Sequence, residues 1–124
     1  ELRAKQVMKH NVITVQKKNR VANAIRLMRR HNVSQLPVTS YGKVVGSVGE
    51  KTILDKISQG VELNSIAVKH VEEIMQEPFP QIDENAPLSV VYALLQYSSA
   101  VLVVKQEHIA GIIAKADLLK AAGK

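Results

Sequence analysis

The chain has 124 residues, 46% of them apolar, which is enough for one domain with a buried core. It contains no cysteine, so disulfides, thiolate metal sites and cysteine nucleophiles are excluded, and we expect a reducing compartment, the cytoplasm. Apolar runs are far shorter than the roughly 18 residues that cross a bilayer, so we expect no membrane span. The net charge of +6 is uneven, because residues 1–60 carry 12 Lys and Arg against 3 Asp and Glu, whereas residues 61–124 carry 5 against 8.

The first half of the chain predicts short elements of alternating type. In chain order they are a helical segment at 3–8, a strand at 13–15, a helix over 21–31, strands at 36–38 and 44–48 joined by a turn at 40–43, and a helix through Ile53 and Leu54. Asn19 is a plausible N-cap for the helix over 21–31, and the basic residues Arg29, Arg30 and His31 close its last turn.

The second half repeats this order. Val7-Met8 is echoed by Ile74-Met75, and the strand at 13–15 by residues 80–82, at a spacing of 67. We align the strand at 36–38 with 102–104, at a spacing of 66. Gly46-Ser47-Val48 then aligns with Gly111-Ile112-Ile113 at 65, so two loop deletions are expected. Pro87 fits the first turn of the second repeat's helix, and residues 106–108 a second hairpin turn.

The predicted organisation is one repeat over 1–60, an inter-repeat linker over 61–70 and a second repeat over 71–124, together forming one globular module. The predicted fold class is mixed α/β (α+β), with two β-α-β-β-α repeats packed face to face in pseudo-two-fold symmetry, because each half-finished sheet needs a partner to bury it. The chain begins at Glu1, so we expect that it was cut from a longer protein whose attached effector domain is missing.

These segments together resemble the cystathionine-beta-synthase (CBS) domain pair, also called a Bateman module, over essentially the whole chain. The resemblance rests on the following segments: Val7-Met8 leading into 12–15, 32–38, 46–54, Ile74-Met75, 102–104 and 111–119. It implies a regulatory module that binds AMP, ADP, ATP or S-adenosylmethionine as an effector in clefts between the repeats. It also implies a homodimer formed through the terminal helices of each repeat.

The resemblance also implies which residues contact the ligand. The family pattern is Gly, two apolar residues, Ser or Thr, two variable residues and an Asp that accepts hydrogen bonds from the ribose hydroxyls. Asp117 matches that carboxylate, whereas Ala114 replaces the Ser or Thr, which removes a phosphate donor and leaves room for S-adenosylmethionine. The other wall of this cleft would come from Met8, Asn11, Ile13, Val33, Ser34 and Gln35.

The mirror cleft lacks both key side chains. Gly49 takes the hydroxyl position and Thr52 the Asp position, so this site should be empty, weak or adapted to another ligand. The residues expected to face them are Met75, Pro78, Pro80, Ala100 and Val101.

Each of these interpretations has a purely structural alternative. Asp117 also suits a helix cap, and Ser34 and Gln35 also suit a junction between a helix and a strand. Arg26, Arg29 and Arg30 form a basic stripe that meets phosphate or an acidic partner, or is simply solvated. The leucine-containing terminal helices equally suit a dimer interface or the core.

Other function classes are disfavoured by the inventory of side chains. Gly46 and Gly49 have the spacing of a KH-domain loop, but an apolar strand precedes them and the chain has only four aromatic residues, so we do not expect direct nucleic-acid binding. The four histidines lack metal-ligand spacing, and no nucleophile or phosphate-loop motif is present, so we expect neither a metal site nor an enzyme. The alternative to a ligand sensor is a ligand-independent dimerisation or interaction module.

Overall fold

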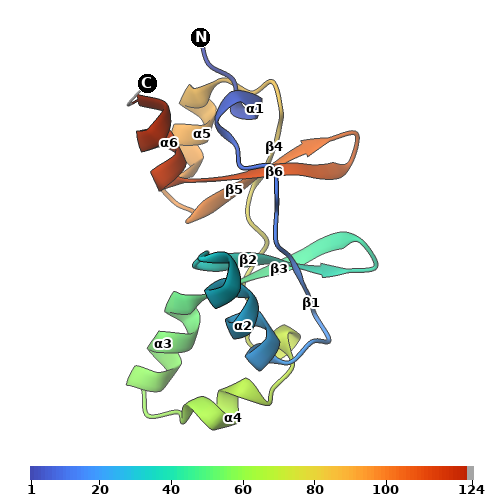
Figure 1. Cartoon of the computed structure of the whole chain (residues 1–124), viewed down its shortest axis with the longest axis vertical. Coiled ribbons are helices and arrows are strands. Elements are labelled where there is room, and N and C mark those ends of the chain that lie inside the picture. Colours follow the sequence, from blue (N-terminus) through green and yellow to red (C-terminus); the bar gives the residue numbers. More distant parts are fainter. Residues whose placement is uncertain (123–124) are drawn as a thin grey trace. The chain divides into compact units, whose positions relative to one another are not determined.

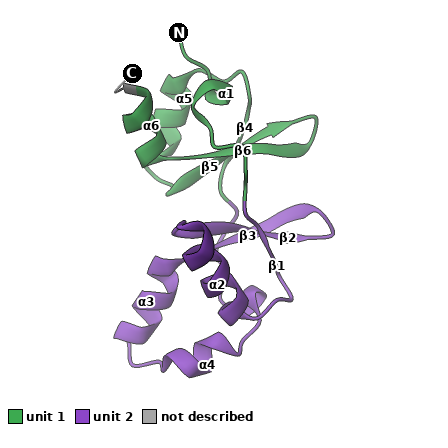
Figure 2. Ribbon diagram, in the orientation of Figure 1, with its two compact units in different colours: residues 1–12, 79–124 green, residues 13–78 purple. Residues whose placement is uncertain are grey.

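The structure is a computed structural model that describes residues 1–122, and it divides into two compact units (Figures 1 and 2). Unit 1 comprises residues 1–12 and 79–124, and unit 2 comprises residues 13–78. Unit 2 contains β1 (Val15–Gln16), α2 (Val21–His31), β2 (Gln35–Ser40), β3 (Lys43–Gly49), α3 (Glu50–Ser58), α4 (Leu63–Ala67) and the 3-10 turn η1 (Val71–Glu73). Unit 1 contains α1 (Ala4–Val7), β4 (Gln81–Asp83), α5 (Leu88–Leu94), β5 (Ala100–Lys105), β6 (His108–Ala114) and α6 (Lys115–Ala122).

Each unit is built on a three-stranded mixed sheet, which confirms the predicted mixed α/β class. In unit 2 the order is β1-β2-β3, with β1 parallel and β3 antiparallel to β2; β4-β5-β6 repeats this arrangement in unit 1. Both hairpins turn where they were predicted. Tyr41 and Gly42 have positive φ in the first turn, and Gln106 and Glu107 have positive φ in the second.

The strand registers correct one step of the sequence alignment. Val38 lies opposite Gly46, and Val103 lies opposite Gly111, so β2 and β5 correspond at a spacing of 65 rather than 66. Val38 therefore matches Val103, not Val104. The repeat spacing therefore changes from 67 to 65 entirely before β2. The pairing register within each sheet is strictly defined, because a slip of one residue would turn every side chain to the opposite face.

The N-cap prediction for α2 is wrong. The helix begins at Val21 with Arg20 at the N-cap, and the Asn19 side chain accepts hydrogen bonds from the Gln16 backbone N–H at 3.4 Å and from the Asn23 amide at 3.2 Å. Asn19 thus closes the turn that precedes the helix. The predicted end of the helix is confirmed, because Asn32 ends it in the left-handed conformation.

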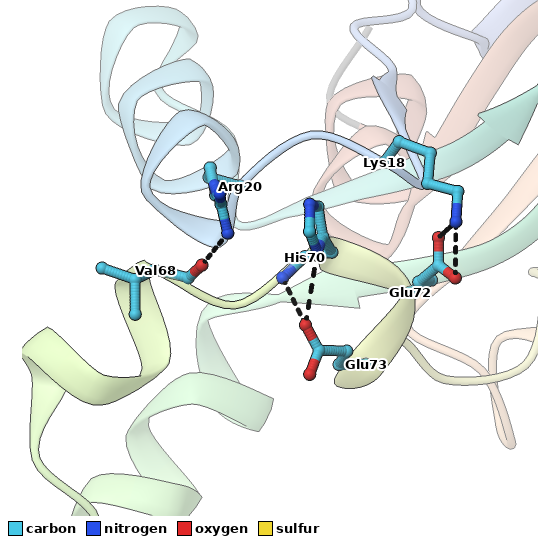
Figure 3. Close-up of polar contacts among 6 residues, drawn as sticks. All are labelled: Lys18, Arg20, Val68, His70, Glu72 and Glu73. Atoms are coloured by element: carbon cyan, nitrogen blue, oxygen red, sulfur yellow. Dashed lines mark hydrogen bonds and ion pairs between the residues drawn. The ribbon is translucent and has the colours of Figure 1, made fainter.

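Residues 61–78 belong to unit 2 and include the helix α4 and the turn η1. α4 buries Ile66 completely, and the Arg20 guanidinium donates to the Val68 carbonyl at 2.5 Å (Figure 3). Lys18 forms an ion pair with Glu72 at 3.1 Å, drawn in the same figure. The predicted linker is therefore part of a folded unit, while the repeat boundaries at 60 and 70 remain a prediction.

The first segment of each predicted repeat packs on the sheet of the other one. In unit 1, Lys9 exchanges two backbone hydrogen bonds with Ile112 of β6, at 2.9 and 3.0 Å. In unit 2, Gln76 exchanges two with Ser47 of β3, at 2.8 and 2.9 Å. The compact units therefore combine sequence-distant parts: residues 1–12 complete unit 1, and residues 71–78 complete unit 2.

A glycine on each last strand makes this exchange possible. A Cβ atom added at Gly46 would lie 2.6 Å from Met75 Sδ and 2.8 Å from the Gln76 carbonyl oxygen. A Cβ atom added at Gly111 would overlap Met8 Sδ in the same way. The two methionines therefore lie where the strands carry no side chain, which allows the backbone of each exchanged segment to approach.

Candidate functional site

The start of α6 in unit 1 holds the predicted ligand carboxylate. β6 ends at Ala114 and the helix begins at Lys115, so Asp117 lies at its third position. Asp117 Oδ2 accepts a hydrogen bond from the Ala114 backbone N–H at 2.8 Å, and the residue is only 4% exposed. The interpretation of Asp117 as part of a helix cap is therefore correct, because it satisfies an N–H that the helix itself leaves without a partner.

Lys9 supplies a positive charge next to this carboxylate. Its backbone is held by the bridge to Ile112, and its Nζ lies 3.7 Å from Asp117 Oδ1 while half of its side chain is exposed. That separation makes an ion pair but exceeds hydrogen-bond distance, so Oδ1 keeps acceptor capacity. Sequence reasoning missed Lys9, because only the bridge to β6 brings it to the start of α6.

The structure places some of the predicted ligand residues together and separates others by unit. Met8, Ala114 and Asp117 belong to unit 1 and lie around the β6–α6 junction, and Asn11 is exposed on the segment that carries Met8. The remaining predicted residues belong to unit 2: Ile13, Val33, Ser34 and Gln35. Their approach to Asp117 remains a prediction.

Two of the predicted residues of unit 2, Ser34 and Gln35, lie at the start of α3. The Ser34 carbonyl accepts the Glu50 backbone N–H at 2.9 Å, and Gln35 pairs with Gly49 across the sheet. Gln35 is thus the first residue of β2, as its structural alternative predicted. A cavity of about 600 Å³ between α2, α3 and α4 was not anticipated. It is lined by Ile25, Met28, Arg29, Asn32, Val33, Ser34, Glu50, Ile53, Leu54, Ile57 and Leu63.

The second predicted site also divides between the units. Gly49, Thr52, Met75 and Pro78 belong to unit 2, whereas Pro80, Ala100 and Val101 belong to unit 1. Thr52 occupies the third position of α3, as Asp117 does in α6, but its hydroxyl donates to the Gln76 side-chain oxygen at 3.0 Å.

The register correction shifts this second set by one residue. At the predicted spacing of 66, Ser34 and Gln35 would match Ala100 and Val101, whereas at the observed spacing of 65 they correspond to Ser99 and Ala100. Val101 and Ala100 are both fully buried in unit 1. The error arose because apolar runs such as 100–104 look alike when shifted by one residue.

Within residues 1–122, no three His, Asp or Glu side chains gather as a metal-ion site, and no helix is long and apolar enough to cross a membrane. The only pKa shift resolved among the described groups is that of Glu73, which is lowered because the His70 backbone N–H donates to its carboxylate at 2.7 Å (Figure 3).

A chain with two such βαββα units belongs to the class of small tandem-repeat α/β modules, and comparison with known proteins names the family. The model of the CBS domain matches residues 4–59 and again residues 71–124. The chain therefore belongs to the CBS-domain family and carries two tandem copies.

Solved structures of CBS-domain proteins have the same fold. The CBS-domain protein NE2398 is 23% identical, with a TM-score of 0.87 over 99% of this chain and 98% of that one. ATU1752 from Agrobacterium tumefaciens is 19% identical, with a TM-score of 0.86 over 98% and 99%. The CBS domain pair of MJ0100, solved with 5′-methylthioadenosine and S-adenosyl-L-methionine, is 24% identical, with a TM-score of 0.83 over 98% and 96%.

Proposed function

We propose that this CBS domain pair is a regulatory module that binds an adenosyl compound, namely AMP, ADP, ATP or S-adenosylmethionine, and thereby controls an attached or partner domain. The observation that carries the proposal is the buried Asp117 carboxylate. Its Oδ2 is held by Ala114, while Oδ1 retains acceptor capacity for a ribose hydroxyl. The adenosyl ligands present in the similar MJ0100 pair support this class of ligand.

We further propose one strong site per chain, at the start of α6. In unit 2 the equivalent residue is Thr52, which already donates to Gln76 and offers no carboxylate. A hydrogen bond to a charged group contributes about 1.5–3 kcal/mol, so a site without it should bind ribose about ten- to a hundred-fold more weakly. The site residues Met8, Asn11, Ile13, Val33, Ser34 and Gln35 form the proposed remainder of the strong site.

The proposed mode of regulation is a shift between two arrangements of the module or of its dimer. Such a shift is limited by the ligand's differential affinity for the two states. In this proposal the module acts on another domain and is not itself an enzyme. The chain's lack of cysteine supports a cytoplasmic location.

The proposed dimer forms through the terminal helices α3 and α6. Leu54 and Leu119 are related by the spacing of 65, and they are 60% and 75% exposed. Neither leucine is therefore a core residue of its unit, although the preceding Ile53 is buried. Two exposed leucines at equivalent positions are suited to contact a second copy of the chain.

The same exposed leucines favour the second candidate function, a ligand-independent dimerisation or interaction module. Dimerisation that no adenosyl compound changes would support this candidate, whereas binding that depends on Asp117 supports the sensor.

The test is calorimetric titration of the chain with the four adenosyl compounds, together with Asp117→Asn. Asparagine keeps an oxygen for the Ala114 N–H but removes the negative charge, so the helix cap is retained while ribose binding weakens. Asp55→Asn is the matched control, because Asp55 is an exposed acid on α3. We expect one of the compounds to bind at one site per chain, with an affinity that Asp117→Asn weakens and Asp55→Asn does not. Absence of binding by all four compounds would overturn the proposal.

A further inference from the structure

The helix start of unit 1 carries lysines at two positions where the equivalent helix start of unit 2 carries none. In unit 1, Lys115 is the first residue of α6 and Lys9 lies beside Asp117. In unit 2, Glu50 is the first residue of α3, and Gln76 occupies the position of Lys9. The equivalence follows from the structure, because Lys9 bridges to Ile112 and Gln76 bridges to Ser47, which lie 65 residues apart like Lys115 and Glu50.

Both lysines keep hydrogen-bond donor capacity, although Lys9 is ion-paired with Asp117. The Lys9 side chain is half exposed and makes no direct hydrogen bond to Asp117, since 3.7 Å separates Nζ from Oδ1. Lys115 is exposed in the first turn of α6, where the helix dipole adds further positive potential. A positive helix start bearing two lysines attracts an anion, although one carboxylate is buried there.

We propose that the site at the start of α6 selects an anionic, 5′-phosphorylated adenosine over neutral or cationic adenosyl compounds, with Lys9 and Lys115 as the specificity-determining residues. This inference rests on the proposed function and names the ligand class of that site. Asp117 accepts from the ribose hydroxyls, and the lysines contact the phosphate. The lysines thereby replace the hydroxyl donor that is missing at Ala114.

The chemistry of the ligands makes this selectivity measurable. A 5′-phosphate carries about −1.5 to −2 charges at neutral pH. 5′-Methylthioadenosine has the same adenosine with an uncharged thioether, and S-adenosylmethionine has a sulfonium cation at the same position. Because Lys9 and Lys115 repel a cation and attract a phosphate, affinity should fall in the order AMP, 5′-methylthioadenosine, S-adenosylmethionine.

The experiment is calorimetry with these three compounds on the wild-type chain and on the double variant Lys9→Gln/Lys115→Glu. This variant installs the residues that unit 2 carries at the same positions. AMP affinity should fall by about tenfold or more, 5′-methylthioadenosine affinity should stay the same, and S-adenosylmethionine affinity should rise. Lys9→Arg should retain the preference for AMP.

Lys120→Gln is the matched control, because Lys120 lies in the last turn of the same helix. It should leave all three affinities unchanged. Equal loss of all three affinities in the double variant would assign the lysines a structural role and overturn the inference. Tighter binding of 5′-methylthioadenosine or S-adenosylmethionine than of AMP by the wild type would also overturn it.

The proposed function is tested separately in the same titrations. Asp117→Asn should weaken 5′-methylthioadenosine binding, which does not depend on the lysines. If that loss is observed without selectivity for AMP, the sensor stands and the inference fails. If none of the three compounds binds and neither ADP nor ATP binds, both fail.

Discussion

Asp117 Oδ2 accepts the backbone N–H of Ala114, three residues earlier, at 2.8 Å. The same relationship recurs at the exchanged segments, where Gln6 accepts from the Arg3 N–H and Glu73 from the His70 N–H, both at 2.7 Å. Three helix starts therefore use the side chain at the third position to satisfy a backbone donor. The start of α3, with Thr52 at that position, does not.

Asp117→Ala should lower the free energy of unfolding by about 1 kcal/mol, because it leaves the Ala114 N–H without its acceptor. Asp117→Asn should lower it less, since the amide oxygen can still accept. Urea denaturation measures both. Asp55→Ala removes only an exposed ion pair with Lys51 and should change stability by less than about 0.5 kcal/mol. Equal stabilities for Asp117→Ala and the wild type would contradict this account of the cap.

Gly111→Ala should destabilise unit 1 by about 1–3 kcal/mol, since the new methyl group would overlap Met8 and lie 2.9 Å from the Lys9 carbonyl oxygen. Urea denaturation of the variant measures this loss. Adding Met8→Ala should restore only part of it, because the backbone carbonyl cannot be trimmed away. A variant with Gly111→Ala that unfolds like the wild type would show that the exchanged segment does not pack this closely.

Glu73 should make the stability of unit 2 sensitive to acid. The His70 backbone N–H lowers the pKa of Glu73, so its contribution is present above the pKa of the unfolded chain and is lost as the pH falls through the lower folded value. Glu73→Gln should therefore remove part of the stability change between about pH 5 and pH 3.

At the start of α1, Gln6 makes the hydrogen bond that corresponds to that of Glu73, but without a charge. Glu73→Gln therefore places at residue 73 the side chain that α1 already uses. Denaturant titrations at several pH values compare the wild type with Glu73→Gln. An identical pH dependence of the unfolding free energy in the two proteins would contradict the prediction.

Leu54→Lys combined with Leu119→Lys should convert a dimer into a monomer while leaving each unit folded, because both leucines are mostly exposed. Analytical ultracentrifugation gives the mass, and circular dichroism checks the fold. Val90→Lys is a control at another exposed apolar residue, on α5. An unchanged mass in the double variant would exclude the terminal helices as the dimer interface.

The two repeats, the order of their elements and the family could all be predicted from the amino-acid sequence. These features depend on local signals: helical clustering of apolar residues over 21–31, turn residues at 40–43 and 106–108, and the echo of Met8 by Met75. Such signals are visible in the sequence because each element must present an apolar face and end at a turn, whatever it packs against.

The strand register, the exchange of segments and the surroundings of Asp117 depend on long-range packing and could not be predicted from the sequence. The register of β5 follows from its pairing with β6, which places Val103 rather than Val104 opposite Gly111. Lys9 and Asp117 are 108 positions apart, and no local pattern connects them. They meet because Gly111 leaves space for Met8 and so holds residue 9 against β6, a long-range packing relationship that periodicity in a single sequence does not encode.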